Sequence, residues 1–250
     1  MKKKLIIIMT LLLVVTITGC KKKEKEEEGF TLTLEDSETM KKVSNLAFVI
    51  DKDSIKVEDY TNEEKEVIAR QMVDNILEST GEEMRLEFQK YFGKDQTVEF
   101  HDIPCWNDPY ALYIFNNETD KYESNPDHPG HGGEGKVTTQ KLMGTPNLTI
   151  DGNTIYYDTK VLFYGPFYCS YGECNYGKLY KTYQDAINET NPIIEIKDTE
   201  YYIMNAEGPA TANLETVVDD YKDKANTYRF TFVKEKDKLT FKEYKILKEE

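Results

Sequence analysis

Residues 148–157, LTIDGNTIYY, decide the fold because they specify a β-hairpin within ten positions. The Asp151-Gly152 pair accepts the positive φ that a tight two-residue turn requires. The second arm continues through residues 161–164 (VLFY) until Gly165-Pro166. This stretch therefore predicts two antiparallel strands, of which the second is long.

A second hairpin is expected at the C-terminal end of the chain. Its first strand has alternate aromatic residues on one face, and apolar residues return after a Glu-Lys-Asp turn: Tyr228, Phe230 and Phe232, then Leu239, Phe241, Tyr244 and Ile246. The step from Phe241 to Tyr244 breaks the two-residue period of a strand, which predicts a β-bulge near Lys242-Glu243.

Helices are expected mainly before the strands. Two capping boxes mark helix starts, one at Thr61 with Glu64 and one at Thr80 with Glu83. In each box the threonine hydroxyl and the glutamate carboxylate satisfy two backbone amides that the first turn leaves unpaired. Three further helices are expected, from about Ser37, over residues 183–189 and over residues 214–221.

Helices first, then a long antiparallel sheet with late helices, predict an α+β fold with helices packed on a curved antiparallel sheet. This element order resembles the cystatin-like and NTF2-like half-cone folds. The resemblance implies a curved sheet that wraps a helix, and it implies no activity.

The N-terminal residues have the pattern of a targeting signal. Lys2 to Lys4 form a positive segment, and the next fourteen residues, Leu5 to Thr18, have no charge. A membrane-spanning helix needs about 20 apolar residues, so the length fits a secretory signal peptide instead. Ile17-Thr18-Gly19-Cys20 resembles the lipobox of bacterial lipoproteins. The resemblance implies cleavage before Cys20, a diacylglycerol on its sulfur, and a protein anchored in the bilayer on the extracytoplasmic face of the cell membrane.

The chain is therefore expected to have three parts. Residues 1–19 are the signal peptide, residues 20–36 are the lipid anchor and a charged flexible tether, and residues 37–250 are a single α+β extracytoplasmic domain. The whole chain has 32 Lys and Arg against 46 Asp and Glu, and cleavage removes three lysines, which leaves a formal charge of −17. Nucleic acid is excluded as a partner because phosphate binding requires clustered basic residues.

Three cysteines remain besides Cys20. Cys169 and Cys174 enclose a short glycine-containing segment, and a disulfide between them is the favoured pairing. The competing connectivity joins Cys105 to either of them.

No catalytic motif is present, so an enzyme is not expected. His101 and Cys105 are four residues apart, but no orienting Asn or Asp is identifiable beside them. His128 and His131 are candidate metal ligands in a loop rich in glycine and proline. Ordering such a loop costs roughly 1–2 kcal/mol per residue, so we expect a solvent-exposed loop without metal, and no cofactor.

Tyrosines gather in one segment of the chain. The candidates for an interaction surface are Tyr164, Tyr168, Tyr171 and Tyr176. The function that the sequence favours is non-enzymatic binding of another cell-surface protein or of a cell-wall or small ligand, on the concave face of the sheet. The alternatives are a hydrolase of envelope polymers and a metal- or solute-binding receptor.

Overall fold

The computed structural model describes most of the chain from residue 31 onward. The described ranges are 31–105, 109–128, 139–165, 168–170, 173–175, 178–195, 203–205, 208–210 and 214–248. Their α-helices are α1 (Leu34–Ala47), α2 (Asn62–Met72), α3 (Gly81–Phe92), α4 (Tyr183–Asn188) and α5 (Leu214–Asp220). The 3₁₀ turns are η1 (Val57–Asp59) and η2 (Lys222–Lys224).

The strands form one large sheet and three small ones. The large sheet contains β1 (Ser54–Lys56), β5 (Gln140–Met143), β6 (Asn147–Asp151), β7 (Thr154–Gly165), β10 (Lys178–Tyr180), β11 (Ile194–Glu195), β14 (Asn226–Glu235) and β15 (Lys238–Leu247). The small sheets are β2 (Ile103–Pro104), β3 (Ala111–Asn116) and β4 (Lys121–Ser124); β8 (Tyr168–Ser170) and β9 (Glu173–Asn175); and β12 (Ile203–Asn205) and β13 (Gly208–Ala210). Every pairing between the described strands is antiparallel, which together with the helices confirms the α+β class.

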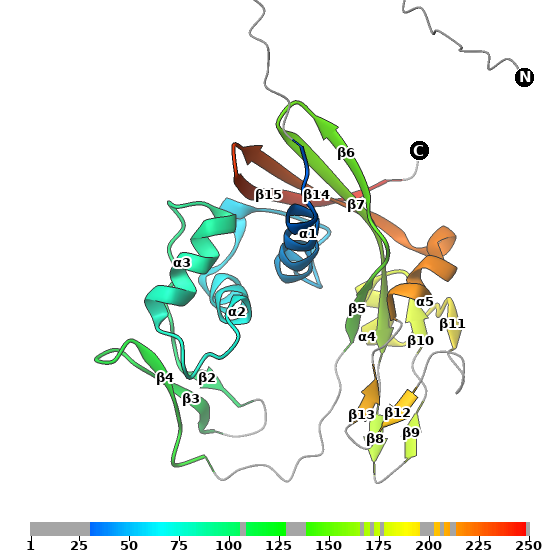
Figure 1. The fold of residues 1–250 in the computed structure, drawn as a ribbon. Coiled ribbons are helices and arrows are strands. Elements are labelled where there is room, and N and C mark those ends of the chain that lie inside the picture. Colours follow the sequence, from blue (N-terminus) through cyan, green and yellow to red (C-terminus); the bar gives the residue numbers. More distant parts are fainter. Residues whose placement is uncertain are drawn as a thin grey trace, which may run out of the picture.

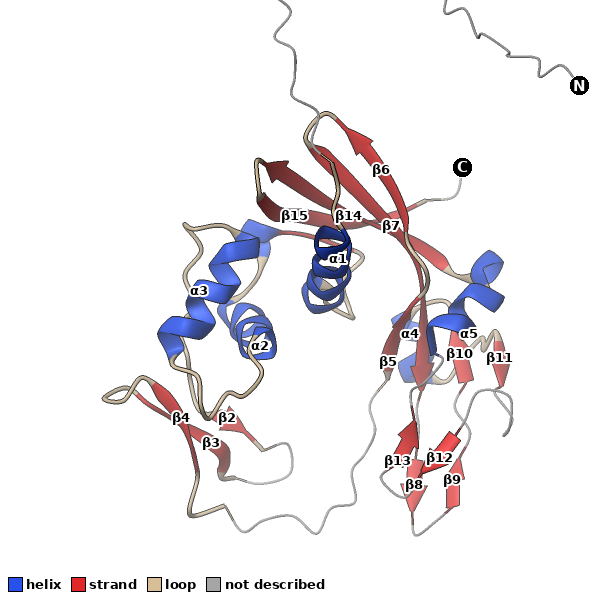
Figure 2. Ribbon diagram, in the orientation of Figure 1, coloured by secondary structure: helices blue, strands red, loops and turns tan. Residues whose placement is uncertain are grey.

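The long strand β7 is the centre of the large sheet. β14 and β10 pair along one of its edges, and β6 and β5 pair along the other. The sheet bends around α1, and β7 runs from the hairpin beside α1 down to α4 and α5 (Figures 1 and 2). Residues on one face of β7, such as Tyr157 and Phe163, belong to the main core, whereas Leu162 and Tyr164 on its other face belong to a second core.

The concave face of the sheet is filled by aromatic side chains. Phe48, at the end of α1, lies 4.8 Å from Tyr228 and 5.1 Å from Tyr244 between ring centroids. Phe230 and Phe241 complete the contact and are fully buried. The expectation of a binding site on the concave face is therefore wrong, because α1 to α3 occupy that face with their own core.

Two lysines of the sheet hold the two ends of α1. At its start, Lys234 pairs with Asp36 in a nearly buried ion pair. At its end, Lys141 donates to the carbonyl groups of Asn45 and Phe48. Burial raises the pKa of Asp36, but the bonds from Lys234 and Thr33 outweigh burial and lower it overall.

The two predicted capping boxes, the hairpin turn and the β-bulge are confirmed. Both predicted capping boxes are present, at Thr61 and at Thr80. The β6–β7 hairpin turns at Gly152, whose φ is 58°. In the C-terminal hairpin, Thr231 pairs with Glu243 and Phe232 pairs with Phe241, so Lys242 is the extra residue of the predicted bulge.

The first helix begins earlier than expected. The predicted start near Ser37 is wrong by three residues, because Thr33 is the N-cap and Asp36 returns the bond as the third helical residue. Residues 34–36, which the sequence analysis assigned to the tether, are thus helical. No helix in the described part of the chain is long and apolar enough to cross a membrane.

Candidate functional site

The small sheet β2–β3–β4 packs its inner face against the helices. Phe100 lies 5.3 Å from Phe115 and 6.2 Å from Tyr122 between ring centroids. Gly81, the first residue of α3, comes so close that a Cβ there would lie 2.5 Å from Asp120 Oδ1 and 3.0 Å from the Phe115 ring. A side chain at this position would displace the Asp120 carboxylate, which accepts a hydrogen bond from the Glu82 backbone amide. The Gly81 amide also donates to the Asp120 carbonyl at 2.7 Å, which joins the sheet to the start of α3.

Glu66 of α2 is a buried carboxylate behind this sheet, with 6% of its surface exposed. Its Oε1 accepts hydrogen bonds from the Tyr122 hydroxyl, at 2.7 Å, and from the His101 backbone amide, at 3.1 Å. Its Oε2 lies 3.1 Å from His101 Nδ1. Burial and the hydrogen bond to Glu66 raise the pKa of Tyr122, so its hydroxyl remains a donor.

This arrangement orients the His101 imidazole. A carboxylate beside Nδ1 favours the tautomer with its proton on Nδ1, which leaves Nε2 as the basic atom. The side chain is 64% exposed, so the ring is open to solvent. Such an imidazole can serve as a general base or as one ligand of a metal ion. Metal binding needs more ligands, and among the described residues no three His, Cys, Asp or Glu side chains are placed to supply them.

Glu66 is the residue that sequence reasoning missed. It lies 35 positions before His101, and it is a glutamate, whereas the orienting residues considered for His101 were Asn and Asp. A signal was present, since Glu66 is three residues before Ala69 and six before Met72, both buried on α2. A charge on an apolar helix stripe predicts a buried partner, because an unpaired carboxylate there would be costly.

The opposite side of β3 is apolar and exposed. Tyr110, Leu112 and Ile114, which we call the β3 outer face, have exposed fractions of 51%, 38% and 37%. The two-residue period of a strand places Leu112 and Ile114 on one face of β3, opposite the buried Phe115, and Tyr110 lies directly before the strand. Adjacent exposed apolar side chains mark interaction surfaces more often than isolated ones do.

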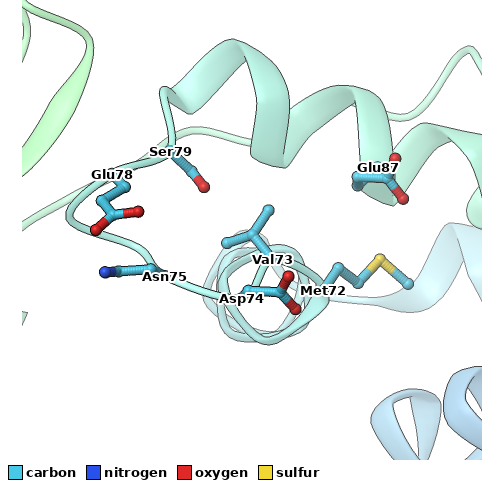
Figure 3. A pocket seen from close by; sticks show the side chains of 7 residues that line it. All are labelled: Met72, Val73, Asp74, Asn75, Glu78, Ser79 and Glu87. Atoms are coloured by element: carbon cyan, nitrogen blue, oxygen red, sulfur yellow. The ribbon is translucent and has the colours of Figure 1, made fainter.

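Two hollows elsewhere are polar. One, of about 400 Å³, lies between the turn after α2 and the middle of α3, from which Glu87 faces it (Figure 3). Asp74 and Glu78 add two more carboxylates to its lining. The other, of about 470 Å³, lies beside the Asp36–Lys234 pair. Neither brings together groups that would define a reaction.

Lys141 is an ammonium group in a largely buried environment at the end of α1. Besides its two carbonyl contacts, its Nζ lies 5.3 Å from the centre of the Phe48 ring. Since α1 has no basic residue in its last turn, Lys141 supplies the cation that the negative end of the helix dipole favours. Burial lowers the pKa of Lys141 from 10.5 to about 8.

We expect Lys141→Met to flatten the dependence of stability on pH in the alkaline range. Between pH 8 and 10.5 the unfolded chain keeps the Lys141 proton while the folded chain loses it. The contribution of this group to the free energy of unfolding therefore rises with pH, by at most about 1.4 kcal/mol per pH unit, and is constant at lower pH. Urea denaturation from pH 7 to 10.5 measures the slope. Lys160→Met controls for the lost charge, and equal slopes in wild type and Lys141→Met would contradict the expectation.

Of the site residues predicted from the sequence, some are described by the structure and others are not. Tyr164 is 4% exposed, because α5 covers the second face of β7 with Val218, and the neighbouring strands β5 and β10 add Leu142 and Leu179 on the same face. Its assignment to a surface is wrong. Tyr168 lies in β8, where only the backbone is described. Cys20, His131, Tyr171 and Tyr176 lie outside the described residues. His128 is half-buried, and its backbone amide donates to the Asn125 carbonyl.

The backbone of β8 and β9 places Cys169 opposite Cys174. Because Ser170 and Glu173 close the two-residue connection, the cysteines occupy the next, non-hydrogen-bonded pair, in which Cα atoms are about 4.5 Å apart. That separation suits a disulfide. Cys105 is half-buried and is outside any disulfide in the described part of the chain.

The disulfide between Cys169 and Cys174 stays a prediction, which thiol labelling checks. The chain without Cys20 has three cysteines, so we expect one alkylated cysteine, Cys105, before reduction and three after it. Three labels on the unreduced, denatured protein would contradict the pairing. A label on either Cys169 or Cys174 would support one of the connectivities through Cys105.

Comparisons with family models, with curated protein sequences and with solved structures find no match to this chain.

Proposed function

We propose that this protein is a lipid-anchored extracytoplasmic lipoprotein whose domain binds another cell-surface protein through the β3 outer face. The observation that carries this proposal is the exposure of Leu112 and Ile114 on one side of β3, while the other side of the same strand is packed against the main core. Apolar and aromatic side chains at the centre of a patch contribute most of the binding energy in protein interfaces.

The path of the chain supports a surface directed away from the membrane. Lys234 contacts both Thr31 and the β6–β7 turn, with its Nζ 3.5 Å from the Thr31 carbonyl and its amide 2.8 Å from the Asn153 carbonyl. The small sheet lies at the other end of the domain (Figure 1). From Cys20, the ten residues 21–30 span at most about 36 Å, which is enough for the β6–β7 turn to lie toward the bilayer while the small sheet points away from it.

Site-specific photocrosslinking in intact cells tests the proposal. With p-benzoylphenylalanine at Leu112, we expect a discrete crosslinked protein product, and with the same group at Ile187 of α4 we expect none. Ile187 is a matched control because it is also an exposed aliphatic residue, at 48%. Ile114→Glu should abolish the Leu112 product. Absence of any product at Leu112 in the folded, processed protein would overturn the proposal.

A second candidate, hydrolysis of an envelope polymer, is favoured by one observation, the Glu66–His101 pair. His101 would act as the general base, with Glu66 as its positioning residue. If the soluble domain releases fragments from purified peptidoglycan and His101→Ala stops the release, this candidate replaces the first. No release by the wild-type domain would remove it.

A further inference from the structure

The segment that carries the β3 outer face is strongly acidic. Residues 101–128 contain six Asp and Glu, a single lysine and no arginine. The lysine, Lys121, donates to the Glu78 carbonyl at 3.2 Å, on the side of the small sheet next to α3. Because Tyr122 of β4 is buried on the inner face, Lys121 lies on the same face of β4 as Glu123. Its amine, however, extends to Glu78, which lies beyond the edge of β4 that does not pair with β3.

Three exposed carboxylates lie on β4 or at its two ends. Glu123 is the cross-strand neighbour of Ile114, so both side chains lie on the same face. Its Oε1 accepts a hydrogen bond from the side-chain Nδ2 of Asn116 at 2.8 Å. Glu118 lies in the turn between β3 and β4. At the opposite end of β4, Asp127 follows Asn125, whose side chain donates to the Ala111 carbonyl.

We propose that the partner of the β3 outer face is a protein surface with an apolar centre and a basic rim, and that the carboxylate rim keeps two copies of this chain from pairing there. This inference rests on the proposed function. Complementary charges across an interface raise the association rate and select the partner, whereas like charges placed together oppose binding. Two copies would bring Glu118 and Glu123 of each chain close to the same residues of the other.

The net negative charge of the whole domain also favours a basic partner. The processed chain has a formal charge of −17, and at physiological ionic strength charges interact over about 8 Å. The rim carboxylates are thus the charges that a docked partner meets, while the remaining acidic surface contributes to its approach. A partner with Lys and Arg around an apolar patch would pair with the rim carboxylates once docked and would also be attracted by the acidic surface as it approaches.

The crosslinking experiment at Leu112 separates this inference from the proposed function. The probe is the photoreactive side chain in the full-length protein, and the variant is Glu118→Lys with Glu123→Lys. We expect its product with the partner to fall about tenfold, the lower range of electrostatic steering effects. Glu38→Lys with Glu235→Lys changes the charge equally, at exposed positions outside the small sheet, and should leave the yield nearly unchanged.

Each outcome has one meaning. A product whose yield is equal in the rim variant and in the wild type would overturn the basic-rim partner while the proposed function stands. A wild-type product formed by two copies of this chain would also overturn it. Absence of every product would overturn the proposed function itself. Circular dichroism of each purified variant verifies that the charge changes leave the fold intact, and peptide mapping of the product should find Lys or Arg beside the crosslinked site.

Discussion

Replacing Tyr244 by alanine is expected to lower the free energy of unfolding by about 3–5 kcal/mol, the range for large aromatic residues removed from a core. Tyr244 is fully buried, and its ring stacks on Phe48 and lies 5.3 Å from Phe230. The substitution therefore removes the ring that joins β15 to the end of α1. Urea denaturation of the chain beginning at Lys21 measures the change.

Two variants serve as controls: Tyr244→Phe removes only the hydroxyl, and Leu86→Ala removes an exposed side chain. The Tyr244 hydroxyl accepts a hydrogen bond from the Val49 amide at 3.1 Å and lies 3.0 Å from the Val49 carbonyl. Tyr244→Phe keeps the ring and should cost about 1–3 kcal/mol, because it leaves the amide without its acceptor. Leu86→Ala, at a position that is 54% exposed, should change stability by less than about 0.5 kcal/mol. Equal midpoints for Tyr244→Ala and Leu86→Ala would contradict the described core.

Cys20→Ser is expected to abolish the lipid-mediated attachment of the processed protein to the membrane. Serine offers no sulfur for the diacylglycerol, so the precursor should stay uncleaved or the protein should leave the membrane fraction. Each buried methylene of an acyl chain contributes about 0.8 kcal/mol, and two chains together hold a protein stably. Fractionation after an alkaline wash, with gel mobility to detect cleavage, measures the effect.

The matched control is Cys105→Ser, which changes a half-buried cysteine of the folded domain and leaves the lipobox intact. We expect this variant to remain in the membrane fraction, processed like the wild type. A cleaved Cys20→Ser protein in the washed membranes would refute the anchor, and with it the orientation on which the choice of the β3 outer face partly depends.

The features that the sequence predicted correctly depend on residues close together in the chain. The turn at Gly152, the bulge at Lys242 and the capping box at Thr61 each involve a few consecutive positions, and local geometry alone determines them. The start of α1 was missed because Asp36, rather than a glutamate, completes its capping box.

The candidate site depends on contacts between segments that are distant in the sequence. The hydrophobic periodicity of a segment predicts its secondary structure but not which distant segment it contacts. Glu66 meets His101 because α2 packs behind the small sheet, and Lys141 reaches the end of α1, 96 positions before it, because β5 pairs with β7. Tyr164 was mistaken for a surface residue for the same reason, since the elements that bury it come from other parts of the chain. The exposure of the β3 outer face could not be predicted from the sequence either, because it depends on which surfaces the other elements of the fold leave uncovered.

The attachment of α1 at both ends has a mechanical consequence. A lipid at Cys20 would transmit any pull from the membrane to Thr31 and the start of α1, where the ion pair between Asp36 and Lys234 joins the helix to β14. Force would reach the sheet at the end of a long strand that is bonded on both sides, by β7 and β15. The domain would thus resist being peeled from its N-terminus, and the load would be shared among the hydrogen bonds of three strands.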